Sequence, residues 1–573
     1  MAGETIKSAA QGLAGLLGGA VQSYGGAVES VGSELKHPER LVKAAEVLVR
    51  SGIVRLERPD TAVQIARTLL EWKMTPAAAF AVSALRFPDA TAIVDERGSL
   101  SFDQVEKRTN ALAHAFAYAG VGSDDSVAIM CRDHRWFVEA TVALSKLGAT
   151  ALYYNTAFAG PQLKEVTERE DPVGIVYDEE FGDALKQALR GREGWIAWDE
   201  EGEASGKATT VEELIERGED TDLPAPPTPG KITLLTSGST GTPKGASRGQ
   251  PDPVEPIVAL LSRIPLKAGE PTVFAAPLFH AWGFLQFNLA LILSSTLVLR
   301  RKFDPEATLA AIQENEATAV VVVPVMLQRI LELHHATRRK YDVSSLRVVA
   351  ASGGAMPAEL SEQWMDEFGD NLYNLYGSTE VAWAAIAGPS DMRAAPGTSG
   401  TPPTGTTLKV LDQEDRSEQE PGETGEVFVG NSMLFEGYTS GESEEMVDGH
   451  MSTGDLGHLD EEGRLFIEGR ADDMIVSGGE NVYPEEVEET LAKHKGVKEA
   501  AVIGVEDEKF GERLKAYVVK SGSVSEKALK DHVKSNLADY KVPREVEFVK
   551  ELPRKPQGKV DKKKLEAEEE EGG

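Results

Sequence analysis

The chain has 573 residues, 93 of them acidic and 60 basic, which gives a net charge of −33 at neutral pH. This length predicts several domains rather than one core, and so acidic a surface repels phosphates and excludes nucleic acid as a partner. The single cysteine, Cys131, excludes an intrachain disulfide and a cluster of thiolate metal ligands. We expect Cys131 to be buried and inert, and the charge predicts a halophilic protein in a salt-rich, reducing cytoplasm.

The first 74 residues form an extension with an apolar segment near its start. The apolar residues that follow one another there at helical spacing are Leu13, Leu16, Leu17, Ala20 and Val21. The segment is too short to span a bilayer and lacks the pattern of a secretory signal. Three interpretations stay open: packing on the body of the protein, disorder, or peripheral contact with a membrane surface.

From about residue 75, strand-like and helix-like segments alternate. In chain order they are 91–96, 102–120, 126–131, 135–149 and 151–155. This alternation predicts mostly parallel sheets covered by helices. The Pro-rich stretch 222–230 is a connection. The apolar stretch 271–299 is interrupted by Pro277 and by polar residues, which favours strand, turn and buried helix over a membrane span.

A loop rich in glycine and hydroxyl groups follows the apolar run 232–235. It reads TSGSTGTPKG over residues 236–245. Glycine lets backbone N–H groups approach phosphate oxygens, the hydroxyls donate, and Lys244 adds a positive charge. Because Lys244 precedes Gly245 rather than Ser or Thr, the loop is not a Walker P-loop. Taken alone, it is equally compatible with a flexible surface turn.

Four more motifs follow in order: NLYGSTE at 374–380, STGDLG at 452–457, GRADDMIVSGGEN at 469–481 and PRKPQGK at 553–559. Together with the loop they resemble those of the acyl-adenylating superfamily of acyl-CoA synthetases, beetle luciferases and peptide-synthetase adenylation domains. The resemblance spans about residues 75–565. It implies an ATP-dependent acid–thiol ligase that forms acyl-AMP and then acyl-CoA, releasing pyrophosphate and AMP, with ATP, Mg²⁺ and coenzyme A as cofactors.

The fold that this resemblance implies is α/β. A large N-terminal domain of helix-covered, mostly parallel sheets is joined by a hinge to a small α+β C-terminal lid domain. The expected parts are an extension at 1–74, the AMP- and acyl-binding domain at 75–469, the hinge at 470–473, the lid at 474–565 and an acidic tail at 566–573. We expect the tail to be solvated and disordered.

The resemblance also assigns an ATP site. The expected cofactor-binding residues are Thr236, Ser237, Gly238, Ser239, Thr240, Gly241, Thr242, Lys244, Gly353, Gly354, Ala355, Tyr376, Gly377, Thr379, Asp455, Arg470, Ser477, Gly478 and Gly479. The loop 236–245 would surround the β- and γ-phosphates, and Thr240 and Glu380 would hold Mg²⁺, a hard cation that prefers oxygen ligands. The glycine loop ASGGAMP at 351–357 would pass between adenine and the acyl pocket.

Four of these residues have individual roles in the resemblance. Tyr376 would stack on adenine and Thr379 would contact the α-phosphate. Asp455 would accept hydrogen bonds from both ribose hydroxyls, with Arg470 joining it. By composition alone, Asp455 and Arg470 would be ordinary surface charges.

The C-terminal motifs imply a domain swing. Asp472 corresponds to the hinge, where the backbone change is concentrated. One orientation would bring Lys559 against the α-phosphate and the acyl carboxylate, which lowers the repulsion between two anions. The other would present the loop around Ser477 to the pantetheine thiol. The basic residues around Lys559 are also compatible with a solvated tail, but the spacing P-x-x-P-x-G-K favours a catalytic lysine.

The acyl site is expected around PLFHAWGF at 277–284, where His280 resembles an aromatic-type gate beside the acyl carboxylate. A lone histidine among aromatic residues is otherwise a core residue. The expected apolar lining is Trp282, Phe284, Val322, Val323, Met326, Ala355 and Trp383. No acidic anchor for an amino group occurs there.

The amino-acid sequence as a whole looks most like those of medium- or long-chain fatty-acid–CoA ligases. An aryl-acid–CoA ligase stays an alternative, and so does transfer of the acyl group to a carrier protein. A non-catalytic nucleotide- or lipid-binding scaffold is the rival from another class. The oligomeric state is open.

Overall fold

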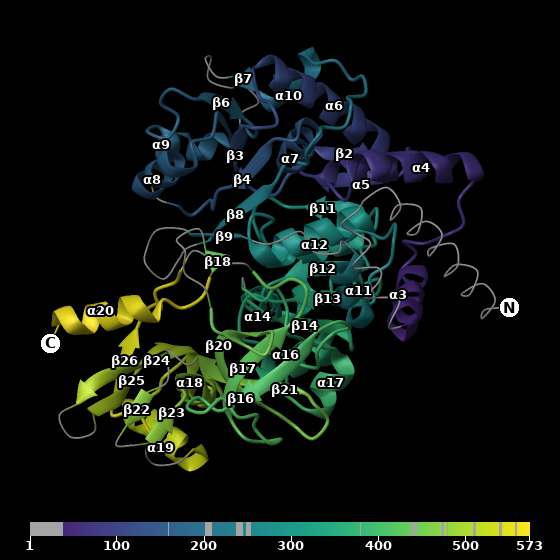
Figure 1. Cartoon of the computed structure of the whole chain (residues 1–573). Helices are drawn as coiled ribbons and strands as arrows, with labels where there is room; N and C mark the ends of the chain where they lie inside the picture. Colours follow the sequence, from purple (N-terminus) through teal and green to yellow (C-terminus); the bar gives the residue numbers. More distant parts are fainter. Residues whose placement is uncertain are drawn as a thin grey trace.

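The computed structural model describes residues 38–158, 160–200, 209–236, 244–247, 254–378, 380–435, 437–438, 444–470, 475–477, 480–507, 511–537, 541–555 and 558–572. The larger part of the chain contains three sheets, and a fourth forms the C-terminal part (Figure 1). The predicted α/β class is confirmed. Among the helices described, none is long and apolar enough to cross a membrane.

The first sheet has the order β18-β9-β8-β4-β3-β5-β6-β7. Its strands are β3 (Ser126–Met130), β4 (Thr150–Tyr153), β5 (Gly174–Tyr177), β6 (Glu193–Ile196), β7 (Thr209–Thr210), β8 (Ile232–Thr236), β9 (Lys244–Ser247) and β18 (Gly437–Tyr438). Strands β3 to β8 are parallel, whereas β9 and β18 extend the sheet beyond β8 by antiparallel pairing. The neighbouring helices are α6 (Phe102–Tyr118), α7 (Arg135–Leu147), α8 (Gly160–Glu170), the 3₁₀ helix η1 (Glu179–Phe181), α9 (Gly182–Leu185) and α10 (Val211–Arg217).

The second sheet has the order β15-β14-β13-β12-β10-β11-β1-β2. Its strands are β1 (Thr91–Asp95), β2 (Gly98–Ser101), β10 (Thr272–Phe274), β11 (Leu297–Leu299), β12 (Ala319–Val322), β13 (Val348–Ala351), β14 (Leu372–Tyr376) and β15 (Ala385–Ala387). All are parallel except the edge strands β2 and β15. Strand β12 is apolar throughout, as is typical of a parallel strand with both faces covered.

Helices pack on and around the second sheet. They are α3 (Pro38–Arg50), α4 (Pro59–Trp72), α5 (Pro76–Arg86), α11 (Val254–Arg263), α12 (Ala281–Ile292), α13 (Pro305–Glu314), α14 (Pro324–Leu331), α15 (His335–Arg338), α16 (Ala358–Phe368) and α17 (Pro389–Ala394). The strand–turn–helix interpretation of 271–299 is confirmed by β10, α12 and β11. Alternate residues of β12 enter different apolar cores: Val321 lies in the core with α12, and Val322 in the core with α16.

The third sheet was not predicted. It is antiparallel and consists of β16 (Thr407–Leu411), β17 (Gly425–Gly430), β19 (Met446–Val447), β20 (His450–Leu459) and β21 (Leu465–Arg470). Short turns can connect antiparallel strands, so the sequence carries none of the strand–helix alternation that predicted the two sheets before it.

The C-terminal part has its own sheet and core, as the α+β prediction requires. Its elements are β22 (Ile475–Ser477), β23 (Glu480–Val482), α18 (Pro484–Ala492), β24 (Val497–Asp507), β25 (Gly511–Lys520), α19 (Glu526–Asn536), β26 (Glu545–Val549) and α20 (Lys562–Gly572). Helices α18 and α19 close one core through Val487, Leu491, Leu529 and Val533, all fully buried.

The expected disordered tail needs a correction, because α20 continues to Gly572. Leu565 in this helix is buried against the sheet. Glu569 lies 2.6 Å from the ammonium of Lys515 and accepts a 2.8 Å hydrogen bond from the Tyr517 hydroxyl. A nearly buried lysine requires carboxylates nearby, so the acidic run neutralises Lys515 and is not purely a solvated segment.

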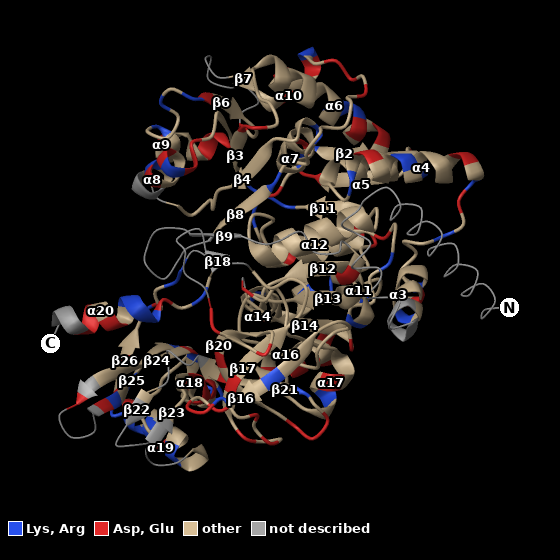
Figure 2. Cartoon of the chain, in the orientation of Figure 1, with Lys and Arg blue, Asp and Glu red and all other residues tan. Residues whose placement is uncertain are grey.

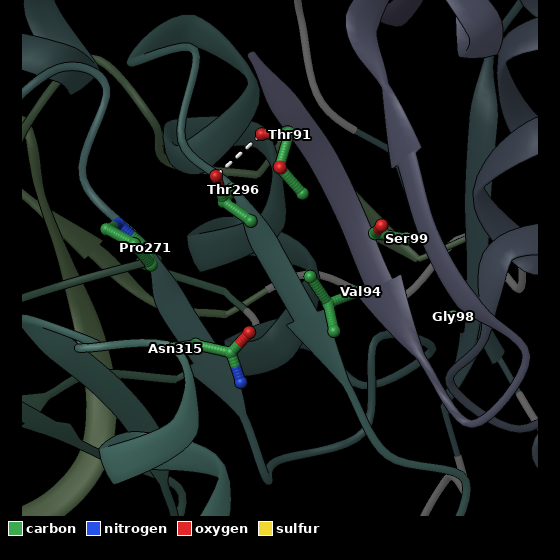
Figure 3. Close-up of a pocket in the computed structure, with 7 residues that line it drawn as sticks. All are labelled: Thr91, Val94, Gly98, Ser99, Pro271, Thr296 and Asn315. Carbon is green, nitrogen blue, oxygen red and sulfur yellow. Dashed lines mark hydrogen bonds between the residues drawn. The ribbon is translucent and has the colours of Figure 1, made fainter.

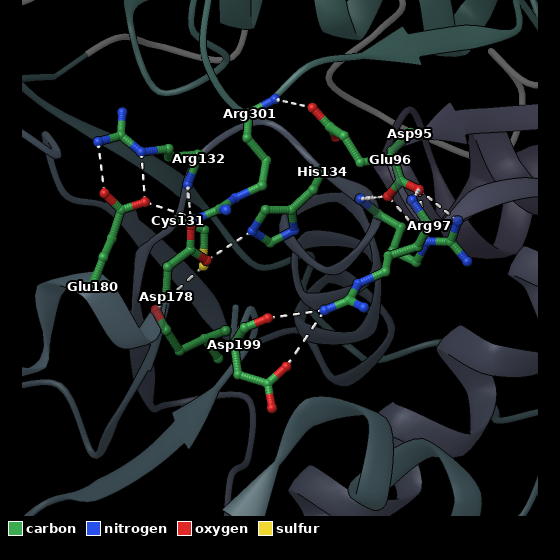
Figure 4. A network of polar contacts seen from close by, with 12 residues as sticks. Asp95, Glu96, Arg97, Cys131, Arg132, His134, Asp178, Glu180, Asp199 and Arg301 are labelled. Atoms are coloured by element: carbon green, nitrogen blue, oxygen red, sulfur yellow. Dashed lines mark hydrogen bonds and ion pairs between the residues drawn. The ribbon is translucent and has the colours of Figure 1, made fainter. Parts of the chain in front are cut away.

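A buried polar network connects the first two sheets (Figure 4). Arg301, which follows β11, lies 2.7 Å from Glu180 and 3.6 Å from Asp178 at the end of β5. Asp178 also contacts the His134 ring at 2.7 Å. Cys131 is fully buried beside this network, and burial raises the pKa of its thiol well above the usual range. The expectation of a buried cysteine is confirmed, whereas its chemical inertness stays a prediction.

Asp133 makes stability depend on pH. It is 4% exposed, it accepts a 3.0 Å hydrogen bond from the Leu278 N–H, and burial raises its pKa to about 8. Between its ordinary pKa of 3.8 and about 8, the folded chain therefore holds a proton that the unfolded chain has lost. Stability should fall as pH rises through this window, by up to about 1.4 kcal/mol per pH unit.

The substitution Asp133→Asn should remove this contribution, because an amide stays neutral and still accepts from Leu278. Urea unfolding at pH 5 and pH 7.5 measures the effect. We expect a smaller loss of stability between the two values in the variant than in the parent. The exposed Glu461→Gln removes one carboxylate as a control. Parallel pH dependences in parent and Asp133→Asn would contradict the assignment.

Candidate active site

Several predicted site residues that the structure describes lie at the carboxyl ends of strands in the second sheet. Tyr376 is the last residue of β14, Gly353 follows β13, and Val323 follows β12. His280 lies between β10 and α12. These four strands are neighbours and parallel, so their carboxyl ends lie side by side. The crevice at the carboxyl ends of strands is where open α/β sheets bind ligands.

The glycine loop after β13 lies against the end of β12. Gly353 has φ of +85°, which favours glycine. A Cβ on Gly353 would lie 3.5 Å from Val323 Cγ1, and a Cβ on Gly354 would lie 3.7 Å from Pro324 Cδ. Gly353 and Ala355 are exposed. The loop therefore offers bare backbone at the edge where the ligand is expected.

Gly377 is required by the turn that follows β14. A Cβ at this position would lie 2.3 Å from the Ala382 carbonyl oxygen and 2.7 Å from Trp383 Cα. The chain folds back here, and the Ala384 N–H donates to the Tyr376 carbonyl at 2.8 Å. Glu380, which is predicted to be a magnesium ligand, is half-buried in this turn.

The third sheet brings Asp455 to Tyr376. The Tyr376 hydroxyl donates to Asp455 Oδ2 at 2.5 Å and lies 3.2 Å from Thr453 Oγ1. Asp455 on β20 is 8% exposed, and the strand register places it opposite Arg470 on β21. Residues from three separate motifs, predicted to bind one adenosine, are thus neighbours in space.

Thr453 was missed by the sequence reasoning. Its hydroxyl donates to the Val427 carbonyl at 3.0 Å and accepts from the Asp455 N–H at 3.1 Å. It therefore orients both Asp455 and Tyr376. The signal available was a threonine two residues before the aspartate in STGD, which could have been interpreted as a side-chain turn.

His280 is an uncharged ring at the start of α12. It is half-buried, its ring centroid lies 4.5 Å from that of Phe279, and burial lowers its pKa to about 4. At neutral pH it therefore carries no charge. A role as gate is compatible with this position, whereas a role in neutralising a carboxylate is not.

The side chains expected to line an acyl pocket do not form one surface. Trp383 is 1% exposed and donates to Thr406, while Trp282 is 7% exposed and donates to the Val322 carbonyl. The Val322 side chain is fully buried on the other face of β12, and Met326 packs against the same core. Val322 is therefore wrong as a lining residue, because the strand turns it away from Val323. Phe284, Val323 and Ala355 keep exposed area.

Other expected residues lie wholly or partly outside the described part of the chain. Those wholly outside it are Ser237, Gly238, Ser239, Thr240, Gly241, Thr242, Thr379, Asp472, Gly478 and Gly479. For the phosphate loop the structure gives its two ends: Thr236 on β8 pairs with Lys244 on β9. Ser477 ends β22 opposite Glu480. The roles of all these residues stay predictions.

Lys559 is exposed on a tight turn of the C-terminal part. The Gly558 N–H donates to the Lys555 carbonyl, and the Lys555 N–H donates to the Lys559 carbonyl, both at 2.8 Å. Just before this turn, residues 550–554 and helix α14 share a cavity of about 520 Å³. Because α14 begins directly after Val323, the segment that carries Lys559 lies close to the helix that borders the candidate site.

A second cavity, of about 510 Å³, lies at the opposite edge of the second sheet (Figure 3). Thr91, Pro271 and Thr296 are at or just before the amino ends of β1, β10 and β11. The predicted motifs contribute none of its lining. It is therefore separate from the candidate active site.

Comparison with known proteins agrees with this geometry. Residues 80–439 match the AMP-binding enzyme family, and residues 486–559 match the AMP-binding enzyme C-terminal domain. The chain belongs to the AMP-binding enzyme family. It is an AMP-forming acid–thiol ligase, and ATP, Mg²⁺ and CoA are the cofactors of this family.

The match to three relatives covers nearly the whole length of each relative. The putative acyl–CoA ligase YdaB of Bacillus subtilis is 30% identical, covering 81% of this chain and 93% of the relative. The indoleacetate–CoA ligase of Aromatoleum aromaticum is 31% identical, covering 83% and 94%. The crystal structure of the anthranilate CoA ligase AuaEII with anthranoyl-AMP has a TM-score of 0.77 at 25% identity, covering 86% and 97%.

Proposed function

We propose that the chain activates a compact, ring-containing carboxylic acid with ATP and transfers the acyl group to CoA. This choice of acid rests on two relatives, which are named as an indoleacetate–CoA ligase and an anthranilate CoA ligase. The packing of Trp282 and Trp383 in the core supports it, because both were expected to line the acyl pocket and their burial leaves less apolar surface for a long chain. A medium- or long-chain fatty acid is the rival substrate.

In the first half-reaction, a carboxylate oxygen attacks the α-phosphorus of ATP. The new bond joins this oxygen to phosphorus, and the bond between the α-phosphorus and pyrophosphate breaks. Both reagents are anions, so positive charge beside them lowers the barrier. Lys559 and Lys244 supply it, and Mg²⁺ neutralises phosphate oxygens when bound. Glu380 would fit this ion, because it is a half-buried acidic residue in the turn that follows β14.

The adenosine part of ATP is positioned by the residues around Asp455. The Asp455 carboxylate accepts hydrogen bonds from the ribose hydroxyls, and the Tyr376 hydroxyl, which donates to Asp455 Oδ2, holds this carboxylate in place. The ring of Tyr376 and the backbone of Gly353 and Gly354 bind adenine. This fixes the α-phosphorus in front of the carboxylate, so that the entropy of orientation is lost on binding rather than in the transition state.

In the second half-reaction, the CoA thiolate attacks the acyl carbonyl carbon and AMP leaves with the bonding electrons. Lys559 is not needed at this stage, and the swing of the C-terminal part about Asp472 replaces it with the segment around Ser477. His280 is neutral and bounds the acyl group; before adenylation it therefore forms no ion pair with the carboxylate of the acid.

A panel of acids tests the substrate. Pyrophosphate release is measured with indoleacetate, anthranilate, decanoate and hexadecanoate, and mass spectrometry identifies the thioester formed with free CoA. We expect kcat/KM for a ring-containing acid to exceed that for either alkanoate by at least about tenfold. A difference in how well two substrates fill an apolar pocket contributes about 1–3 kcal/mol to the transition-state free energy. A preference for hexadecanoate would restore the fatty-acid assignment. Acyl-AMP without acyl-CoA would favour a carrier protein.

We also propose that the enzyme works best at high salt. Acidic side chains occur on helices and loops throughout the described part of the chain (Figure 2), and the net charge is −33. Screening weakens the mutual repulsion of these charges. Activity at saturating ATP should therefore rise with KCl into the molar range. An optimum in dilute buffer would contradict this proposal.

A further inference from the structure

Exposed apolar side chains are concentrated around α4. Nine large apolar side chains are exposed in the described part of the chain, and six of them lie between residues 42 and 74. They are Val42 (52% exposed), Leu56 (97%), Val63 (70%), Leu69 (39%), Leu70 (50%) and Met74 (45%). This region precedes the family match, which begins at residue 80. The ATP and acyl sites do not use it.

Helix α4 has two apolar faces. One face packs on α5 through the buried side chains of Thr61 and Ile65. The other carries Val63 and Leu70, which are seven residues apart and both exposed. A helix at the margin of the molecule (Figure 1) normally presents polar side chains to water. An apolar outer stripe of this kind marks an interaction surface.

The charge on α4 differs from that of the whole chain. From Asp60 to Lys73 there are two acidic and two basic residues, whereas the whole chain carries −33. Arg67 and Glu71 pair with each other at 2.7 Å. The two remaining charges, Asp60 and Lys73, lie at opposite ends of the helix. The stripe is thus one place where another strongly acidic molecule is not repelled.

We propose that α4 pairs antiparallel with α4 of a second copy of this chain, about a two-fold axis near Arg67. In this register Val63 lies opposite Leu70 of the second copy, and Asp60 lies opposite Lys73. Each pairing occurs twice, as a two-fold interface requires. The two Arg67 side chains meet near the axis, where Glu71 neutralises each of them.

The same features argue against a membrane as the occupant. Helices that lie on lipid carry Lys and Arg on the polar face, and anionic headgroups repel a net charge of −33. The complementary ends, Asp60 and Lys73, would gain nothing from a lipid surface. They gain a partner of opposite charge when the helix meets its own copy in the antiparallel sense.

Light scattering coupled to size-exclusion chromatography of the full chain tests the proposal, followed by sedimentation equilibrium for the dissociation constant. The parent should be a dimer. Val63→Glu and Leu70→Glu should each yield monomer at the same concentration, whereas Tyr118→Glu, at a residue 96% exposed elsewhere, should leave the dimer intact. Circular dichroism and the rate of acyl-AMP formation should match the parent in all three variants.

Charge reversal distinguishes this antiparallel helix pairing from any other interaction of the exposed apolar stripe. Asp60→Lys and Lys73→Asp should each weaken the dimer by at least about tenfold, and the double variant should recover most of the loss. The proposal would be overturned if the parent is a monomer, or if the Val63→Glu and Leu70→Glu variants remain dimers. It would also be overturned by dimerisation that begins only after residues 1–37 are removed, or by Leu70-dependent flotation with phosphatidylglycerol vesicles.

Discussion

Replacing Lys559 with alanine should lower the rate of acyl-AMP formation by at least about 100-fold and leave the thiolysis of supplied acyl-AMP within a few-fold of the parent. A positively charged donor aimed at charge that develops in the transition state contributes about 3 kcal/mol or more. Lys559 is exposed on its turn and no part of a core, so the variant should fold. ATP–pyrophosphate exchange reports the first half-reaction, and release of AMP from synthetic acyl-AMP plus CoA reports the second.

Neighbouring lysines provide the matched controls. Lys555→Ala and Lys563→Ala remove the same charge from exposed positions in the same basic neighbourhood. Both should retain adenylation close to that of the parent. Equal loss of the two half-reactions in Lys559→Ala would contradict a role confined to adenylation. Equal effects of all three variants would mean that Lys559 acts only through the general positive charge of its neighbourhood.

Replacing Asp455 with alanine should lower kcat/KM for ATP by about 100-fold and abolish the preference for ATP over 2′-deoxy-ATP. Hydrogen bonds to a charged acceptor contribute about 1.5–3 kcal/mol each, and the carboxylate is expected to accept two. The parent should prefer ATP clearly, since only ATP has both hydroxyls. The substitution removes the difference because the acceptor itself is absent.

Tyr376→Phe is the control for this prediction. It removes the hydroxyl that donates to Asp455 but keeps the carboxylate and an aromatic ring. We expect a smaller loss, with the preference for ATP retained and Thr453 still supporting Asp455 through the backbone. A variant Asp455→Ala that still prefers ATP to the deoxynucleotide would place the ribose elsewhere.

Much of the fold could be predicted because each segment of the parallel sheets carries its own pattern. The segments 126–131 and 135–149 alternate as strand and helix, and they form β3 and α7. The third sheet escaped prediction because its antiparallel strands follow one another through turns. The helix α20 escaped because its run of glutamates is typical of a solvated tail, and only the tertiary structure reveals Lys515 beside Glu569.

The candidate site could be predicted to the level of motifs but not of side-chain direction. Tyr376 and Asp455 are 79 residues apart, yet they form a direct hydrogen bond. The order of the motifs was sufficient to predict that these two residues are close in space. For the acyl pocket it was not: Val322 and Val323 are adjacent in the chain but face different sides of the sheet, and a one-residue difference of this kind follows from strand register rather than composition.

A single-turnover experiment with ATP labelled at the α-phosphate tests the central claim most directly. Enzyme in excess over labelled ATP is mixed with the acid in the absence of CoA, quenched and separated. We predict that labelled acyl-AMP accumulates with release of pyrophosphate, and that a chase of CoA converts it to labelled AMP and acyl-CoA. Formation of labelled ADP, or acyl-CoA that appears without an acyl-AMP intermediate, would contradict the account.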